Sequence, residues 1–314
     1  MNELSVIIAF RNENIEVERT ILEIKRTAGS SVDIILVNDA SEDSYDYASI
    51  ACKYQAAYIE NSERQGCAQS REIGIKAAKT PCIFIVDGHM RFYDNSWHEE
   101  IVKAIKKNPR AVYCCRCKVW DYEEKEESPK EPNYGAYFKL YDIKTKEVME
   151  VKWISKNIYR DTDEDIVEIP CVLGACYAAS KAYWDYLRGL CGLKLYSCDE
   201  AYISIKAWME GGGCRLLKNV AVGHLFRDKF PYAVSEKEFL YNKAFIAETI
   251  FPNDIKEEIN KKLKLGLGFV DYSRLKRKLN QEEIDDYKKY YSLALTAGFE
   301  NFQRINNQTI EKLA

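Results

Sequence analysis

Residues 5–86 alternate between short apolar runs, often β-branched, and segments with helical spacing. Val17, Ile21 and Ile24 recur at the interval of one helix face, and residues 66–79 read as a second helix. The predicted strands cover residues 5–10, 33–37, 57–59 and 82–86. Because strands that alternate with helices form parallel sheets covered on both faces, we predict an α/β fold with ligands at the carboxyl ends of its strands.

The remainder of the chain changes character twice. Residues 121–168 are charged and contain two prolines, so we expect an excursion from the core. The apolar residues 169–178 read as one strand that returns to the core. Helical patterns dominate the last part of the chain, and the predicted domains are residues 1–250 and a helical C-terminal extension, residues 251–314.

The chain contains three histidines, and two of them stand in segments typical of a metal site. Asp87 directly follows the buried strand predicted for residues 82–86, and His89 comes two residues later. Alternate residues of an extended chain point to the same side, so this carboxylate and imidazole come together. His224 would supply a third ligand. This mixed set of oxygen and nitrogen ligands suits Mn²⁺ better than Mg²⁺, which prefers oxygen.

The cysteines bear on compartment and on a second metal site. There are eleven, an odd number. Cys114, Cys115 and Cys117 share a strand-like stretch without a second Cys-x-x-Cys pair, which favours reduced buried thiols over a zinc site. No run approaches about 18 apolar residues, and residues 1–4 are not those of an export signal. Free cysteines, no export signal and no membrane span predict a cytoplasmic protein.

The net charge of −3 provides no overall field that would attract nucleic acid. Charges do cluster locally. Basic runs occupy residues 261–264 and 274–278, and acidic runs occupy residues 121–127 and 161–165. Runs of this kind are typically solvated helix faces or loops.

Two common nucleotide-binding motifs are absent from the sequence. No Gly-x-Gly-x-x-Gly follows a strand, and no Gly-x-x-x-x-Gly-Lys-Ser/Thr occurs. The glycines at 211–213 follow a helical pattern, which indicates a helix C-cap and a turn. His98, beside Trp97, is interpreted as an ordinary surface or packing residue. A dehydrogenase or a P-loop nucleotidase is therefore not expected.

The metal-site segments and their order resemble a known family. The Asp-x-His of residues 87–89, followed by Val-Gly-His-x-Phe-Arg at residues 222–227 and Pro-Tyr at 231–232, resembles the polypeptide N-acetylgalactosaminyltransferases and the wider family 2-type nucleotide-sugar transferases. The likeness covers roughly residues 4–120 and 168–250. It implies a GT-A fold, a Rossmann-like, mostly parallel sheet flanked by helices. It also implies metal-dependent transfer from a UDP-sugar, with Mn²⁺ or another divalent metal.

The resemblance implies where the donor binds. Asp39 ends the second predicted strand and matches an acidic residue that accepts a hydrogen bond from the uracil ring. The backbone around Ala9 and Phe10 would hold the other edge of the base. From the residues alone, Asp39 is equally typical of a helix N-cap or a turn. Gly88 and Gly174 complete the residues expected around the nucleotide sugar.

Arginines are expected around the diphosphate, because their planar fork makes paired hydrogen bonds to phosphate oxygens. The resemblance assigns Arg64, Gly66 and Arg71 to the segment that approaches the donor. For Arg71 a plain surface arginine is the alternative. Arg227 and Tyr232 would close over the diphosphate once the donor binds.

Asp199 and Glu200 are the expected catalytic carboxylates. Inverting relatives have Glu-Asp in this segment, with the aspartate as general base, whereas the retaining polypeptide transferases have Glu-Asn. Glu200 falls on the base position and Asp199 beside it, so we predict inversion at the anomeric carbon. The alternative is retention, because the segment from His224 to Tyr232 resembles the retaining enzymes closely. The same two acids are typical of a helix N-terminus, and the two interpretations are compatible. Tyr196 stands where the retaining enzymes carry a tryptophan.

The acceptor stays open at this point. A protein or peptide hydroxyl or a glycan is expected. The alternative is a phage-type DNA glycosyltransferase that acts on a hydroxymethylated base, for which basic C-terminal helices would suit phosphate contacts. A catalytically silent nucleotide-binding module is disfavoured by the complete ligand set, and a nucleotidyltransferase by the absence of a Gly-x-Gly-Thr-Arg opening. The oligomeric state is not predicted.

Overall fold

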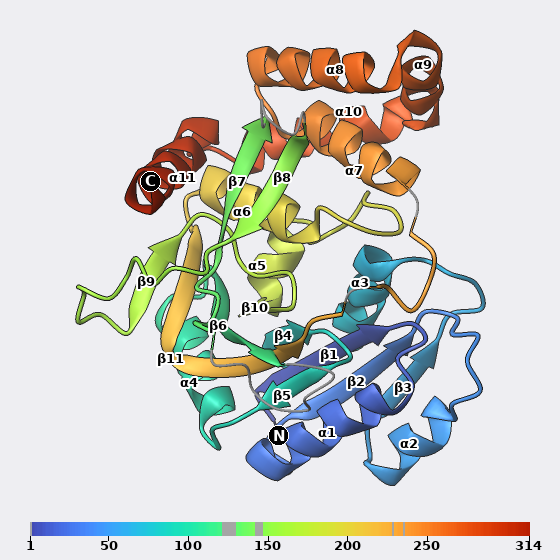
Figure 1. Ribbon diagram of the computed structural model, residues 1–314, viewed down its shortest axis with the longest axis vertical. Helices are drawn as coiled ribbons and strands as arrows, with labels where there is room; N and C mark the ends of the chain where they lie inside the picture. Colours follow the sequence, from blue (N-terminus) through green and yellow to red (C-terminus); the bar gives the residue numbers. More distant parts are fainter. Residues whose placement is uncertain (1, 121–129, 142–146, 228, 235) are drawn as a thin grey trace.

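A computed structural model describes residues 2–120, 130–141, 147–227, 229–234 and 236–314. Within these ranges a nine-stranded sheet has the order β3-β2-β1-β4-β10-β6-β11-β5, with β9 paired to β11 (Figure 1). Its strands are β1 (Leu4–Phe10), β2 (Asp33–Asn38), β3 (Ala57–Glu60), β4 (Cys82–Val86), β5 (Met90–Phe92), β6 (Val112–Trp120), β9 (Ile166–Ile169), β10 (Cys176–Ser180) and β11 (Cys214–Leu225). A separate hairpin consists of β7 (Ala136–Tyr141) and β8 (Val148–Trp153).

The helices flank this sheet and form the C-terminal end of the molecule. They are α1 (Ile15–Ala28), α2 (Tyr47–Lys53), α3 (Cys67–Ala77), α4 (Trp97–Lys107), α5 (Lys181–Tyr186), α6 (Asp199–Glu210), α7 (Glu236–Thr249), α8 (Asn253–Leu267), α9 (Phe269–Lys278), α10 (Gln281–Ala294) and α11 (Gly298–Leu313). None of them combines the length and apolar character that crossing a bilayer requires.

The N-terminal half of the sheet confirms the predicted strand–helix alternation. β1 pairs in parallel with β2 and β4, and β2 pairs in parallel with β3. Each of these strands lies within one residue of its predicted bounds. Val6, Ile7 and Ile8 are fully buried, so both faces of β1 are apolar, as in a sheet covered by helices on both sides. This continuous apolar run is why the strand could be recognised in the sequence. The mostly parallel α/β fold is therefore present.

One predicted strand is wrong. Residues 169–178 were expected to be continuous, but β9 ends at Ile169 and β10 begins at Cys176. Pro170 has no N–H to donate to a neighbouring strand. The Cys176 N–H then donates to the Leu173 carbonyl at 3.2 Å, which closes a turn between the two strands. After this turn β10 runs antiparallel between β4 and β6.

The residues beyond 250 are helical, as predicted, and they pack on the first part of the chain. The Tyr291 hydroxyl on α10 lies 2.9 Å from the Tyr202 hydroxyl on α6, and Asn301 on α11 donates to the Trp208 carbonyl at 2.8 Å. The boundary at residue 250 stays a prediction. The acidic run at 121–127 lies outside the described residues.

Cys114, Cys115 and Cys117 lie buried in β6 as free thiols, in keeping with the expectation of reduced core cysteines. His98 is likewise buried, and its ring lies 5.5 Å from the Trp97 ring at a steep angle. It is therefore a packing residue.

Lys206 on α6 is fully buried. Its ammonium group donates to the Leu187 carbonyl at 2.9 Å, to the Gly189 carbonyl and to the Tyr291 hydroxyl at 3.3 Å. These neutral acceptors only partly replace water, and burial lowers the pKa of Lys206 to about 7 from its ordinary 10.5. The lysine thus connects α6 to the residues after α5 and to α10, while its burial destabilises the protonated form.

This burial predicts a pH-dependent stability. Between pH 7 and about 10 the unfolded chain holds the Lys206 proton and the folded chain releases it, so the free energy of unfolding increases with pH. The free energy of unfolding of the wild type minus that of Lys206→Met should therefore increase by about 2 kcal/mol from pH 7 to pH 9. Urea denaturation at both pH values measures it, and the subtraction cancels the other titrating groups. A difference that is constant with pH would contradict the prediction.

Candidate functional site

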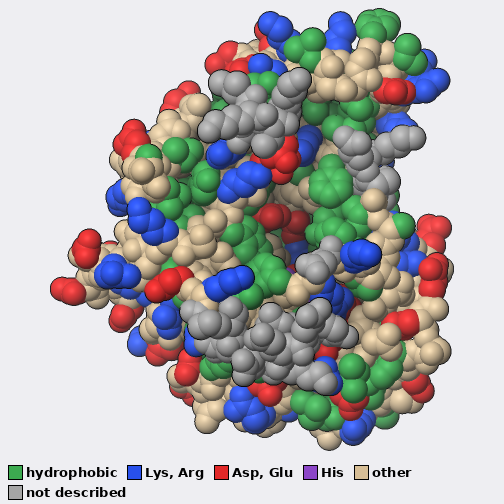
Figure 2. Space-filling view, in the orientation of Figure 1, with side chains coloured by type: hydrophobic (Ala, Val, Ile, Leu, Met, Phe, Trp, Pro, Cys, Tyr) green, Lys and Arg blue, Asp and Glu red, His purple; other side chains and the backbone are tan. Residues whose placement is uncertain are grey.

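A cleft of about 460 Å³ opens at the carboxyl ends of β1, β2 and β4 and is visible as the central hollow in Figure 2. Its walls also include β8, the end of β11, the start of α6 and part of α7. Every residue predicted for the site lines it: Ala9, Phe10, Asp39, Arg64, Gly66, Arg71, Asp87, Gly88, His89, Gly174, Asp199, Glu200, His224, Arg227 and Tyr232. The fold brings this set together; the individual roles stay predictions.

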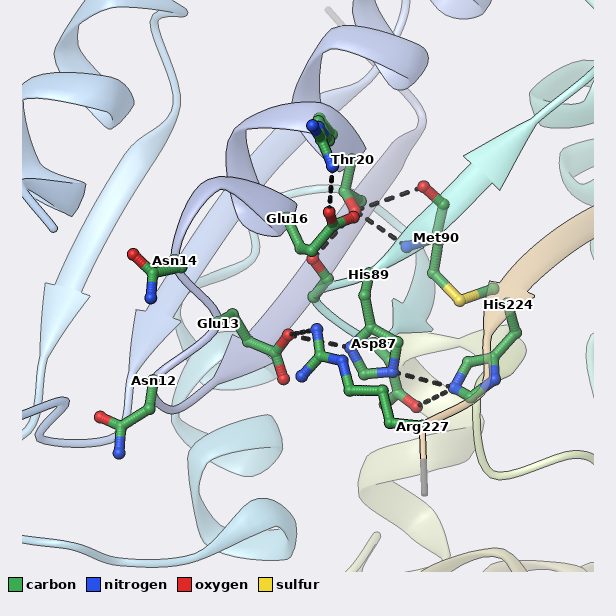
Figure 3. Close-up of polar contacts among 12 residues, drawn as sticks. Asn12, Glu13, Asn14, Glu16, Thr20, Asp87, His89, Met90, His224 and Arg227 are labelled. Carbon is green, nitrogen blue, oxygen red and sulfur yellow. Dashed lines mark hydrogen bonds and ion pairs between the residues drawn. The ribbon is translucent and has the colours of Figure 1, made fainter. Parts of the chain in front are cut away.

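The predicted metal ligands converge at one end of the cleft (Figure 3). Asp87 follows β4, His89 precedes β5, and His224 lies on β11, which pairs with β5. The Nε2 atoms of His89 and His224 are 3.1 Å apart, and Nε2 of His224 is 3.3 Å from Oδ2 of Asp87. In the described part of the chain, this is the one group of three such side chains close enough to hold a metal ion.

The spacing and the protonation of these groups fit a divalent cation. Ligand atoms about 2.1 Å from one ion and about a right angle apart are about 3.0 Å from one another. The Nδ1 of His89 lies 3.1 Å from Oε2 of Glu13, so it carries the proton and leaves the Nε2 lone pair for a metal. The buried Nδ1 of His224 has no hydrogen-bond partner among the residues that the structure describes.

Glu13 also lines the cleft, and the sequence motifs did not point to it. It is buried, and besides His89 it accepts from the guanidinium of Arg227 (Figure 3). Burial alone would raise its pKa, but the charges and hydrogen bonds of His89 and Arg227 lower the pKa below its ordinary value. A signal was available, because Glu13 stands three residues past the end of β1, at the same sheet edge as Asp87.

Arg71 is buried rather than on the surface, so the alternative interpretation of this residue is wrong. Its guanidinium donates to Oδ1 of Asp87 at 2.7 Å, to the Gly174 carbonyl at 2.9 Å and to Asp199. Burial opposes ionisation of Asp87, yet the hydrogen bond with His224 and the charge of Arg71 hold its pKa well below the ordinary value. Asp87 is therefore ionised, as a metal ligand must be.

Asp39 directly follows β2, and its carboxylate faces the loop before α3. It accepts from the backbone N–H of Gln65 at 2.7 Å, from that of Gly66 at 2.8 Å and from the Asn61 side chain at 2.9 Å. Neither a local turn nor a helix N-cap describes these contacts, because the partners lie 22 to 27 residues further along the chain. A carboxylate has about four acceptor positions and three are in use here, which leaves about one for a uracil N–H. The contact with uracil stays a prediction.

Gly66 permits a close approach between two parts of the cleft wall. It has φ +90°, and a Cβ atom there would lie 2.0 Å from Cα of Leu195. Any side chain at this position would therefore push the segment before α6 away from the start of α3. Gly66 is also the N-cap residue of α3, so the predicted helix begins one residue later than expected.

Asp199 and Glu200 occupy the first turn of α6, as the helix N-terminus interpretation required. Glu200 lies against Gly174, where a Cβ atom would stand 3.3 Å from its carboxylate. Asp199 is paired with Arg71, whereas no ion pair of Glu200 is formed within the described residues. Burial and the negative charge of Asp199 raise the pKa of Glu200 well above its ordinary value. Of the two adjacent acids, Asp199 is the one that pairs with the guanidinium, and its charge adds to the effect of burial on Glu200.

The segment after β11 is tied to the start of the chain. Arg227 pairs with Glu13, and the Asn12 side chain donates to the Pro231 carbonyl at 3.1 Å. The Arg64 guanidinium lies 5.4 Å from the centre of the Tyr232 ring, a cation–π distance. These contacts hold the segment after β11 over the cleft, beside the predicted metal ligands.

The parts of the cleft wall that β8 and α7 supply were not foreseen from the sequence. β8 supplies Glu150, which pairs with Lys243 of α7 at 2.6 Å, and Trp153, whose ring lies 6.1 Å from that of His224. Tyr196 packs on Phe239 with ring centres 5.6 Å apart. No local pattern marks Glu150, Lys243 or Trp153, because their contacts form only when β8 lies beside α7 and β11 in the folded chain.

Residues 5–165 match the model of glycosyl transferase family 2. The chain belongs to this family, which confirms the resemblance inferred from the motifs. It is 25% identical over 268 residues to polypeptide N-acetylgalactosaminyltransferase 12 of Mus musculus and 27% identical over 238 residues to polypeptide N-acetylgalactosaminyltransferase 14 of Homo sapiens. These alignments cover 81% and 73% of this chain but only 44% and 41% of the relatives.

Solved structures confirm the GT-A fold. The crystal structure of GalNAc-T7 with UDP, GalNAc and Mn²⁺ superposes with a TM-score of 0.76 at 20% identity, covering 99% of this chain and 57% of that one. Staphylococcus aureus TarS 1–349 in complex with UDP-GlcNAc gives a TM-score of 0.52 at 14% identity, covering 99% and 92%.

The contact of Glu13 with His89 predicts an effect on metal affinity. Glu13→Gln keeps the shape but weakens the acceptor that orients the imidazole, so affinity for Mn²⁺ should fall about 10- to 100-fold. Titration of the protein with Mn²⁺, followed by the electron paramagnetic resonance signal of the free ion, measures it. Glu18→Gln is the matched control, because Glu18 binds Tyr45, Lys53 and Tyr54 on the far side of α1. Equal affinities in both variants would contradict the role of Glu13.

Proposed function

We propose that this protein transfers a sugar from a UDP-sugar to a hydroxyl acceptor in a reaction that depends on a divalent metal such as Mn²⁺. The observation that carries the proposal is the convergence of one carboxylate oxygen and two imidazole nitrogens in a cleft at the carboxyl ends of parallel strands. Membership of glycosyl transferase family 2 supports the same reaction class.

In this proposal, each part of the cleft has a task. Asp87, His89 and His224 hold the metal, which would act as a Lewis acid and offset the charge that develops on the departing UDP. Arg71 keeps Asp87 ionised and oriented. Arg227 and Tyr232 cover the diphosphate and exclude water while the glycosidic bond to phosphate breaks. Asp39 and the backbone at Ala9 and Phe10 receive the uracil.

The donor and acceptor are proposed from the relatives. Several of them are named polypeptide N-acetylgalactosaminyltransferases, and the GalNAc-T7 structure contains UDP and GalNAc. UDP-GalNAc with a peptide hydroxyl is therefore the first pair to test, with a glycan acceptor next. No observation in the cleft favours the DNA acceptor.

The metal assignment predicts that turnover depends on His224. His224→Ala removes one of three ligands and should abolish Mn²⁺-stimulated hydrolysis of UDP-sugars, while the fold persists because only one side chain at a strand end is lost. Release of UDP from a panel of UDP-sugars, with Mn²⁺ or with EDTA, measures it. His98→Ala is the control, since this histidine packs outside the cleft. Full activity in EDTA or in His224→Ala would exclude a metal role.

We also propose that Glu200 is the general base and that the anomeric configuration inverts. A base works best when its pKa lies near the working pH, and the pKa of Glu200 is raised toward that range. Gly174 leaves open the space in front of the Glu200 carboxylate, where an acceptor hydroxyl would bind.

This role predicts a pH profile. Because the pKa of Glu200 is raised, its basic form accumulates as pH increases, and turnover of the wild type should increase with it. Glu200→Gln should lose about 100- to 10,000-fold in kcat and lose this increase, with donor affinity unchanged. Rate measurements across pH, calorimetry with UDP and NMR of the product's anomeric coupling check it. Retention of the donor's α configuration would reduce Glu200 to a structural or acceptor-binding residue.

A further inference from the structure

The corner between α8 and α9 exposes an apolar tip. Leu265, Phe269 and Val270 are 73%, 68% and 60% exposed. They are three of the four most exposed large hydrophobic side chains in the described ranges. A Cβ atom at Gly266 or Gly268 would meet no atom within 4 Å. The corner therefore projects away from the rest of the protein, at the end of the molecule opposite α1 and α2 (Figure 1).

This tip is not part of the face with which the two helices pack. Ile259 and Leu263 of α8 and Leu275 of α9 are buried and supply that face. The core contacts of both helices are thus complete without the tip. Three large apolar side chains left together in water mark an interaction surface more often than a chance exposure.

The tip is surrounded by positive charge. Residues 253–278 contain eight Lys and Arg against four Asp and Glu, a net charge of +4, whereas the whole chain has −3, so the remainder has −7. Lys264 Nζ lies 5.1 Å from the Phe269 ring centre. Basic side chains alternate with hydrophobic ones along the upper edge of Figure 2, where Figure 1 places α8 and α9.

We propose that the α8–α9 corner docks on an anionic lipid bilayer. Leu265, Phe269 and Val270 would enter the boundary between headgroups and acyl chains, while the flanking basic side chains contact lipid phosphates. The charge separation would orient the protein, because the remaining surface is repelled by the same membrane. This inference does not depend on the proposed reaction.

Two other occupants fit the surface less well. Nucleic acid would satisfy the basic residues but leave the apolar tip without a partner. A second copy paired symmetrically through this corner would bring two patches of charge +4 together, which opposes association. A bilayer with acidic lipids satisfies both features at once.

The test is a flotation assay that measures binding of the full chain to vesicles of phosphatidylcholine with about 30% phosphatidylglycerol. That fraction of acidic lipid gives the vesicles a negative surface potential. We expect binding that weakens with salt and is absent on pure phosphatidylcholine. Replacing Lys261, Arg277 and Lys278 by Ser should weaken it about 100-fold, at about fivefold for each charge. Replacing Leu265, Phe269 and Val270 by Ser should weaken it at least about tenfold.

Leu293→Ser is the matched control, because Leu293 on α10 is 75% exposed but lies outside the corner. It should bind vesicles as the wild type does, and circular dichroism should show all variants folded. Failure to prefer anionic vesicles, or an equal loss in Leu293→Ser, would overturn the proposal. The proposal would also be overturned if the two triple variants bound vesicles as the wild type does and altered only the oligomeric state of the protein, measured by sedimentation, or its binding to duplex DNA.

Discussion

One buried guanidinium holds the cleft together. Arg71 of α3 contacts Asp87 after β4, Asp199 at the start of α6 and the Gly174 carbonyl before β10. Removing carboxylates from water costs several kcal/mol each unless a cation repays it, so both acids depend on this one side chain. The proposed metal end and the proposed base end of the cleft are therefore positioned by a single cation. Glu200, beside Asp199, has a raised pKa because of burial and the charge of that neighbour.

The polar contacts continue from that cation across the whole site. Asp87 contacts His224, His224 contacts His89, and His89 contacts Glu13, which pairs with Arg227 after β11. The predicted metal ligands are thus joined by a chain of contacts to the segment that covers the cleft. Under the proposed function, this connection would let metal binding and donor binding favour each other.

Much of the fold could be predicted because its signals are local. Both faces of β1 and β4 are apolar, and the ligands Asp87 and His89 directly follow such a strand. The split between β9 and β10 was missed because an apolar run carries no information on where its hydrogen-bond partners end. Pro170 was the one local warning. Glu13 also had a local signal, its place past β1, but the motif comparison did not single it out.

The sequence by itself determined the order of strands and helices in the N-terminal half, the types of side chain at the strand ends and the family. These follow from periodicity and from residues close together in the chain. Only the tertiary structure decided that Arg71 is buried between two acids, that Asp39 serves the loop before α3, and that Glu150 meets Lys243. The reason is that charge state and pairing depend on which distant side chains share a site, and on how much water the fold removes from around them.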